Sequence, residues 1–114
     1  NFGSGAGLFG NAGQCSYAAA KEAIRGLSRV AAAEWTQYGI NTNVLLPAIE
    51  TDAMRAWAEE HPEEYEEAIK ATPAGHFADA QIHVGGTALH LASPAGKMTS
   101  GYSIGVDGGQ NLRP

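Results

Sequence analysis

The sequence predicts an α/β fold built around a parallel sheet, and three observations support this class. Helical and strand-like segments alternate along the 114 residues, without internal repeats or long linkers. Residues 40–47 include three consecutive apolar positions, as in a parallel strand that helices cover on both faces. Residues 14–38 contain no proline and repeat apolar residues at helical spacing. The length allows one small domain at most.

The first forty residues are expected to form a strand end, a glycine-rich loop and a long helix. The stretch "NFGS" reads as the end of a strand, and glycines follow at positions 5, 7, 10 and 13. The helix runs from about Gln14 to Tyr38 and stops at Gly39. It carries a stripe of large apolar residues and a stripe of small ones, so we expect burial on two sides. The stripes are Ala20, Ile24, Leu27, Ala31, Trp35 and Tyr38, and Ala19, Ala23, Gly26, Val30 and Ala33.

The remaining residues predict a strand, three helices and a closing strand. The strand at 40–47 ends at a proline, and two short helices follow at 52–60 and 62–71, broken at Pro62. A last helix spans about 80–92, with Asp79 as its N-cap and Pro94 beyond its end. The stretch "YSIGVDGG" then supplies the final strand.

Composition excludes several classes of function. A hydrophobic content of 44% is that of a globular protein, and no stretch resembles a membrane span or a signal peptide, so we expect a cytoplasmic protein with no membrane partner. The net charge is −5, and six glutamates between positions 59 and 67 form what we take as a solvated helix face. This charge opposes nucleic acid as a partner. Cys15 is the only cysteine, and we expect it to be a buried, unreactive thiol in a reducing compartment.

Tyr17 and Lys21 are the first candidates for chemistry. They lie four positions apart in a predicted helix, so their side chains emerge from one face, one turn apart. With the tyrosines and lysines present, composition alone produces such a pair about one time in ten. The pair by itself therefore leaves coincidence open.

Several further segments occur in an order that is typical of one enzyme family. Ser4 precedes Tyr17 by thirteen positions, "GNAGQCSYAAAK" leads into the long helix, "PAGHFAD" precedes the last helix, and "GYSIGVDGG" closes the chain. Together they resemble the second half of a short-chain dehydrogenase/reductase of the compact type, over all 114 residues. The resemblance implies the C-terminal half of a Rossmann-like doubly wound parallel sheet, with about three strands, one long catalytic helix, lid helices, and a final helix and strand.

The same resemblance indicates what the chain lacks. Members of the family carry a glycine-rich phosphate loop, an Asn-Asn-Ala-Gly stretch and a catalytic asparagine, and none of these occurs here. We therefore expect residues 1–114 to be the catalytic and substrate-binding half, with the N-terminal dinucleotide-binding half absent. The residue that separates NAD from NADP belongs to that other half, so the cofactor preference stays open.

The resemblance implies hydride transfer between a secondary alcohol and NAD or NADP, with Ser4, Tyr17 and Lys21 as catalytic residues. Tyr17 is the implied acid and base, Lys21 tunes it and bonds the nicotinamide ribose, and Ser4 holds the substrate oxygen. A free tyrosine has a pKa of about 10 and is a poor base near neutral pH. The ammonium of Lys21 favours the ionised tyrosine by direct attraction, most strongly in a site closed to water.

The stretch "PAIETDAM" after the predicted strand departs from the family pattern. Many members read Pro-Gly-x-Ile/Val-x-Thr there, whereas here Ala48 replaces the glycine and the loop is one residue shorter. Dinucleotides bind outside the carboxyl ends of parallel strands, which favours this loop, but Ile49 and Thr51 can also be ordinary loop residues. The cofactor-binding candidates are Tyr17, Lys21, Pro47, Ile49 and Thr51.

The substrate-binding candidates are Ser4 and Gln14. Met54 and Trp57 could also line a pocket, but helix packing explains them equally well. The substrate itself, a small alcohol or ketone, is not identified by the sequence.

Two hypotheses about the chain remain open. The first is an NAD(P)(H)-dependent oxidoreductase, and the second is a truncated, inactive relative that serves in assembly or binding. We expect a homo-oligomer, either a dimer or a tetramer, or association with the missing half. His83 and His90 lie in the last helix without acids at ligand spacing, so no metal is implied.

Overall fold

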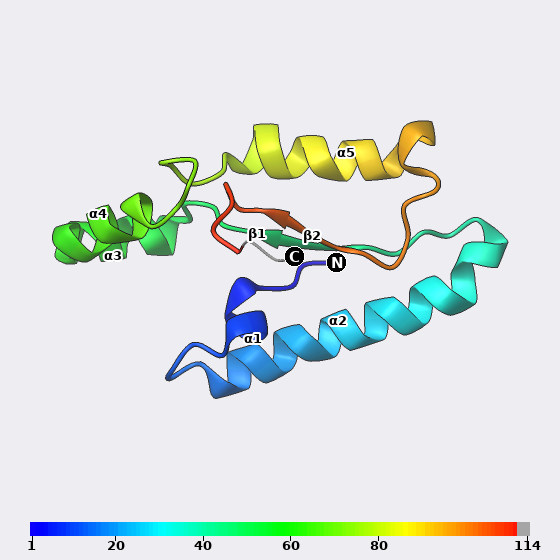
Figure 1. Ribbon diagram of the computed structural model, residues 1–114, viewed down its shortest axis with the longest axis horizontal. Helices are drawn as coiled ribbons and strands as arrows, with labels where there is room; N and C mark the ends of the chain where they lie inside the picture. Colours follow the sequence, from blue (N-terminus) through cyan, green and yellow to red (C-terminus); the bar gives the residue numbers. More distant parts are fainter. Residues whose placement is uncertain (112–114) are drawn as a thin grey trace.

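A computed structural model describes residues 1–111 of the chain, and its elements follow the expected α/β order. Figure 1 shows a central sheet with α2 along one face and α5 along the other, while α3 and α4 project beyond one end. The α-helices are α1 Gly5–Phe9, α2 Cys15–Trp35, α3 Asp52–Glu60, α4 Pro62–Lys70 and α5 Gly86–Ala92. The other elements are the 3₁₀ helices η1 Thr36–Tyr38 and η3 Pro94–Gly96, the π-helical η2 Ala80–Gly85, and the strands β1 Val44–Pro47 and β2 Ser103–Val106.

The sheet is parallel, as the sequence predicts. β1 pairs with β2 from Val44 opposite Ser103 to Pro47 opposite Val106, and the N-terminal segment adds a parallel bridge from Phe2 to Leu45. The three apolar residues of β1 are 2–5% exposed, which confirms a strand covered on both faces. The strand begins later than predicted because the side chain of Asn43 bonds the loop before β2, at Thr99 O and Tyr102 N.

The long helix has the predicted extent but not the predicted burial. After α2 and η1 the chain turns at Gly39, which takes a φ of 78°, as expected of a helix stop. In α2 the buried residues are Ser28, Ala31 and Ala32, while Leu27 is 65% exposed. Ala31 is thus the one buried member of the two predicted stripes, and most of each stripe is left uncovered within residues 1–111.

Two predictions near the start of the chain are wrong. The glycine-rich segment contains a short helix, α1, because Ser4 caps it by accepting a hydrogen bond from Ala6 N–H at 3.2 Å, and Gly10 ends it with a left-handed φ of 73°. Cys15 is exposed rather than buried. It is the first residue of α2.

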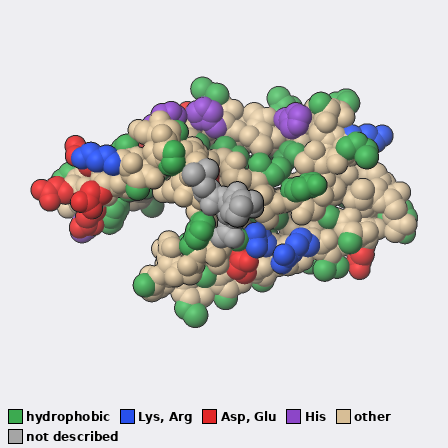
Figure 2. All heavy atoms as spheres, viewed as in Figure 1, with side chains coloured by type: hydrophobic (Ala, Val, Ile, Leu, Met, Phe, Trp, Pro, Cys, Tyr) green, Lys and Arg blue, Asp and Glu red, His purple; other side chains and the backbone are tan. Residues whose placement is uncertain are grey.

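The two short helices form as predicted. Thr51 caps α3 through Met54 N–H at 3.1 Å, and Pro62 begins α4. The glutamates of α4 are exposed, which confirms the solvated face, and Figure 2 shows acidic side chains gathered at the end of the molecule that α3 and α4 form. Within residues 1–111 no helix combines the length and the apolar character needed to cross a membrane.

The last predicted helix begins with a π-helical segment. Asp79 caps η2 as expected, accepting hydrogen bonds from Gln81 N–H at 2.8 Å and Ile82 N–H at 2.6 Å. The pKa of Asp79 is held below its ordinary value, chiefly by the hydrogen bond from Ile82 and also by the one from Gln81.

Replacing Asp79 with alanine should destabilise the fold at neutral pH and not in strong acid. A carboxyl group whose folded pKa is lowered contributes stability above its unfolded pKa of about 4, and that contribution is lost as the pH falls through the folded value. Denaturant unfolding between about pH 7 and pH 2 measures the effect. Asp79→Asn keeps an oxygen cap and should lose less at neutral pH. An equal gap between wild type and Asp79→Ala at both ends of the range would contradict the assignment.

Candidate active site

One large cleft contains all the residues that the sequence predicts as site residues. It has a volume of about 1270 Å³ and lies between the start of α2, the carboxyl end of β1 and the start of η2. In Figure 2 the molecule is hollowed between the end formed by α1 and the end formed by α3 and α4. The predicted residues that line it are Ser4, Gln14, Tyr17, Lys21, Pro47, Ile49 and Thr51.

The structure separates the two uncertain apolar candidates. Met54 lines the cleft together with Phe77, Ala80 and Val84. Trp57 does not, and its ring instead stacks on His61, with ring centroids 5.3 Å apart. Met54 therefore lines the cleft, whereas Trp57 of α3 packs on His61 at the start of α4.

Tyr17 and Lys21 lie together on the first turns of α2. The Lys21 Nζ atom is 5.6 Å from the centroid of the Tyr17 ring, and it donates a hydrogen bond to Phe2 O at 3.3 Å. Tyr17 is 48% exposed and lines the cleft, so its side chain is accessible to a ligand there. Phe2 belongs to the segment that bridges β1, so the hydrogen bond from Lys21 connects α2 to the sheet.

Ser4 reaches the cleft because the N-terminal segment runs close against β1. Gly3 is buried, and a Cβ atom there would lie 2.6 Å from Leu46 Cδ2 and 2.9 Å from Val44 Cγ1. Only glycine allows this approach without displacing the core. Ser4 follows in an extended conformation, where its hydroxyl caps α1 and lines the cleft. The glycine that precedes the serine is the sequence signal for this close approach.

The loop after β1 contributes candidate cofactor residues that also have structural roles. Ile49 bridges Ala78 in parallel register, and Ala78 N–H donates to Ala48 O at 2.8 Å. Thr51 caps α3. Both residues line the cleft, which agrees with a role in binding. The bridge to Ala78 and the cap of α3 also give each residue a structural role.

Sequence reasoning missed a cluster behind this loop. The Tyr65 hydroxyl on α4 donates a hydrogen bond to Glu50 Oε1, and the Tyr65 ring lies 5.9 Å from the ring of Phe77. The hydrogen bond to the Glu50 carboxylate is the main reason why the pKa of Tyr65 is raised above its ordinary value. The two hydrogen-bonded residues are fifteen positions apart, so no helical or strand periodicity connects them.

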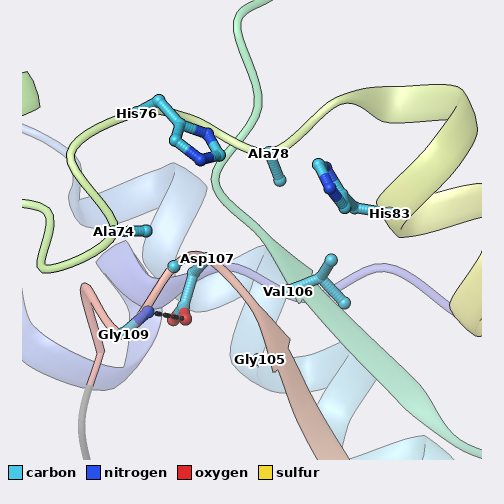
Figure 3. A pocket seen from close by; sticks show the side chains of 9 residues that line it. Ala74, His76, Ala78, His83, Gly105, Val106, Asp107 and Gly109 are labelled. Atoms are coloured by element: carbon cyan, nitrogen blue, oxygen red, sulfur yellow. Dashed lines mark hydrogen bonds between the residues drawn. The ribbon is translucent and has the colours of Figure 1, made fainter.

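A second, smaller cavity of about 340 Å³ lies beside the end of β2. Figure 3 shows the rings of His76 and His83 over this hollow, while the carboxylate of Asp107 turns toward Gly109. The His83 Nδ1 atom accepts a hydrogen bond from Asp79 N–H at 2.7 Å. Asp107 accepts from Gly109 N–H and from the backbone and side chain of Asn111. Among residues 1–111 no group of three or more His, Cys, Asp or Glu side chains is arranged to hold a metal ion.

Comparison with known proteins decides the family. Residues 1–111 match the family described as Enoyl-(Acyl carrier protein) reductase. A solved oxidoreductase of the short chain dehydrogenase/reductase family from Burkholderia thailandensis superposes with a TM-score of 0.85 and 31% identity, over 96% of this chain and 42% of that one. The chain belongs to the short-chain dehydrogenase/reductase family. The resemblance read from its motifs is therefore confirmed.

Two further relatives of this short-chain dehydrogenase/reductase chain are informative. A 12alpha-hydroxysteroid dehydrogenase from a Clostridium species is 49% identical over 114 residues, covering 100% of this chain and 44% of the relative. The structure of a putative 2-deoxy-d-gluconate 3-dehydrogenase from Agrobacterium tumefaciens, with bound NADP, superposes with a TM-score of 0.89 and 32% identity, over 99% of this chain and 46% of that one. The chain thus spans less than half the length of the relatives that it matches. Its Rossmann-type α/β architecture is confirmed by these structures.

Proposed function

We propose that this chain is the catalytic and substrate-binding half of an NAD(P)(H)-dependent oxidoreductase that interconverts a secondary alcohol and a ketone. The observation that carries the proposal is the cleft at the carboxyl end of β1, which Ser4, Tyr17 and Lys21 line together. The dehydrogenase names of the relatives and the NADP in a related structure support it. The dinucleotide-binding half is proposed to lie outside these 114 residues, in agreement with the 44–46% of the relatives that the chain covers.

In this proposal Tyr17 moves the proton and its neighbours stabilise charge. The nicotinamide cofactor, when bound, supplies or accepts the hydride. The ionised Tyr17 oxygen takes the hydroxyl proton of the alcohol during oxidation, and the neutral hydroxyl returns it during reduction. The Lys21 ammonium favours the ionised tyrosine. The Ser4 hydroxyl donates a hydrogen bond to the substrate oxygen as that atom gains charge.

The residues around the cleft fit a nicotinamide ribose and carboxamide. A lysine ammonium has three N–H donors, and Lys21 directs one of them to Phe2 O. The remaining donors can bond ribose hydroxyls. Pro47, Ile49 and Thr51 line the cleft beside the end of a parallel strand, which is where dinucleotides bind in open α/β sheets.

Cofactor titration tests this function. NADH and NADPH are added separately to the complete enzyme that contains this chain, and nicotinamide fluorescence is followed. We expect one of the two reduced cofactors to bind saturably. We also expect the enzyme to form that reduced cofactor from its oxidised form when a panel of secondary alcohols is supplied. If neither saturable binding nor formation of reduced cofactor is seen, the proposal is overturned.

The alternative function is that of a truncated module that acts in assembly or binding. The phosphate loop that would place the pyrophosphate at a helix N-terminus does not occur in these 114 residues, so the chain by itself should bind the cofactor weakly. The same titration on residues 1–114 should show no saturable binding in either case. Activity of the complete enzyme then separates an enzyme from an inactive relative.

We further propose that α2 packs against a second copy of the protein in a homo-oligomer, and that the protein is cytoplasmic. Leu27, Val30 and Trp35 are 65%, 54% and 45% exposed along this helix, and exposed apolar faces of this kind favour association. The single cysteine is free, which suits a reducing compartment.

Replacing Gly26 with leucine should weaken the oligomer more than the fold. A Cβ atom at Gly26 meets no atom within 4 Å, so the chain itself has room for a side chain, whereas a close helix–helix contact does not. Sedimentation velocity measures the change, and Gly26→Ala is the matched control. An unchanged sedimentation profile for Gly26→Leu would remove α2 from the interface. Loss of folding instead would assign this face to the other half of the enzyme.

A further inference from the structure

Glu50, Tyr65 and Phe77, here called the Tyr65 cluster, connect the loop after β1, helix α4 and the segment before η2. Glu50 lies between the two candidate cofactor residues Ile49 and Thr51, Tyr65 lies on α4, and Phe77 leads into η2. The Tyr65 hydroxyl donates to the Glu50 carboxylate while its ring contacts Phe77 at a centroid distance of 5.9 Å. One side chain thus touches both the loop after β1 and the segment before η2.

Backbone contacts also connect the loop after β1 to the segment before η2. Ala78 N–H donates to Ala48 O at 2.8 Å, and Ile49 forms a parallel bridge with Ala78. The loop after β1 is therefore tied to the segment at 76–78 by its backbone and, through Tyr65, to α4 by a side chain. Two independent ties fix the orientation of a loop better than one.

Apart from Arg55 of α3, which donates to Glu50 Oε2 at 3.5 Å, the lid helices α3 and α4 have few other ties to the fold. Neither α3 nor α4, both described throughout, contains a buried residue. The other side-chain hydrogen bonds and ion pairs found on α4 are local, such as Lys70 to Glu66 and His61 to Glu64. Exposed pairs of this kind contribute little to stability. The half-buried Tyr65 is thus the side chain of α4 that reaches the cleft loop.

We propose that Tyr65 and Glu50 are positioning residues that hold the lid helices and the loop after β1 in the arrangement that binds cofactor. The proposal rests on the proposed function, because it assigns the loop to that cofactor. Neither residue lines the cleft, so both act through their neighbours: Glu50 through Ile49 and Thr51, and Tyr65 through Phe77. These contacts hold Met54 of α3 and Phe77 in position to line the cleft.

Two variants test the hydrogen bond in the complete enzyme. Tyr65→Phe keeps the ring contact with Phe77 and removes the donor, and Tyr102→Phe is the matched control because Tyr102 is 62% exposed and does not line the cleft. We expect Tyr65→Phe to raise the KM for the cofactor about tenfold, as for loss of one hydrogen bond to a charged group, with kcat within about twofold of wild type. Tyr102→Phe should match wild type.

Glu50 variants show whether the two residues act as a unit. Glu50→Gln keeps an oxygen acceptor for the Tyr65 hydroxyl and should stay closer to wild type, whereas Glu50→Ala should raise KM at least as much as Tyr65→Phe does. Glu50→Ala also removes the contact between Arg55 and Glu50 Oε2 at 3.5 Å, so the double variant should be no worse than Glu50→Ala alone. Additive losses would overturn the proposal.

A measurement without cofactor completes the test. Amide hydrogen exchange across residues 52–70 should be faster in Tyr65→Phe than in wild type or Tyr102→Phe, since the lid then opens more often. Equal exchange and an unchanged KM, in an enzyme that Tyr17→Phe inactivates, would refute the positioning role alone. Full activity of Tyr17→Phe would refute the proposed function and this inference with it.

Discussion

Replacing Tyr17 with phenylalanine should abolish turnover of the complete enzyme and leave cofactor binding nearly unchanged. The substitution removes the hydroxyl that we propose moves the proton, and general acid–base catalysis contributes about 10²- to 10⁴-fold. The ring stays, so the contact with Lys21 Nζ at 5.6 Å from its centroid is kept. Steady-state kinetics measure kcat and KM, and nicotinamide fluorescence measures the dissociation constant of the cofactor.

A matched tyrosine controls for the loss of a hydroxyl elsewhere. Tyr102 lies outside the cleft, and Tyr102→Phe should retain full turnover. Turnover of Tyr17→Phe within a few-fold of wild type would show that another group moves the proton. A large loss of cofactor affinity would show instead that the hydroxyl contributes to binding.

Local patterns explain why most of the fold could be predicted. The extent of α2 follows from helical spacing, the absence of proline and a glycine at its end, all of which act within a few residues. The three apolar residues of β1 require cover on both faces, and the structure supplies it. Asp79 and Pro62 mark helix starts through their own hydrogen bonding and backbone geometry.

Burial was harder to predict because it depends on surfaces far apart in sequence. Spacing shows that α2 has apolar stripes but not which surface covers them, and Leu27 remains exposed in this chain. Cys15 was expected to be buried from its residue type, yet its place at the start of α2 exposes it. Helix α1 forms in a glycine-rich stretch, where Ser4 caps its start and α2 packs beside it.

The residues that line the cleft could be predicted better than the residues that hold them in place. Ser4, Tyr17 and Lys21 were found from their order along the chain, and all three line the cleft. Gly3 and the Glu50–Tyr65 hydrogen bond were missed, since a close approach of two backbones or a contact across fifteen residues leaves no periodic pattern. The catalytic roles remain predictions that kinetics must test.

Replacing Lys21 with methionine should impair both turnover and cofactor binding, unlike Tyr17→Phe. Methionine keeps an apolar stem of similar length but removes the positive charge near Tyr17 and the donors assigned to the ribose. Losing a hydrogen bond from a charged group costs roughly tenfold or more in binding, so we expect turnover at neutral pH to fall at least about tenfold. Cofactor titration should show a higher dissociation constant.

The pH profile of Lys21→Met separates its electrostatic role from a structural one. If the ammonium favours the ionised tyrosine, the oxidation activity of the variant should recover partly at alkaline pH, while the weakened cofactor binding should not recover. Lys21→Arg keeps the charge and should retain the wild-type profile even where its geometry lowers the rate. Lys21 also donates to Phe2 O, and loss of that bond alone would lower activity equally at every pH. A pH-independent loss with unchanged cofactor affinity would therefore reduce Lys21 to a tie between α2 and the N-terminal segment, and the tuning role of the pair would be wrong.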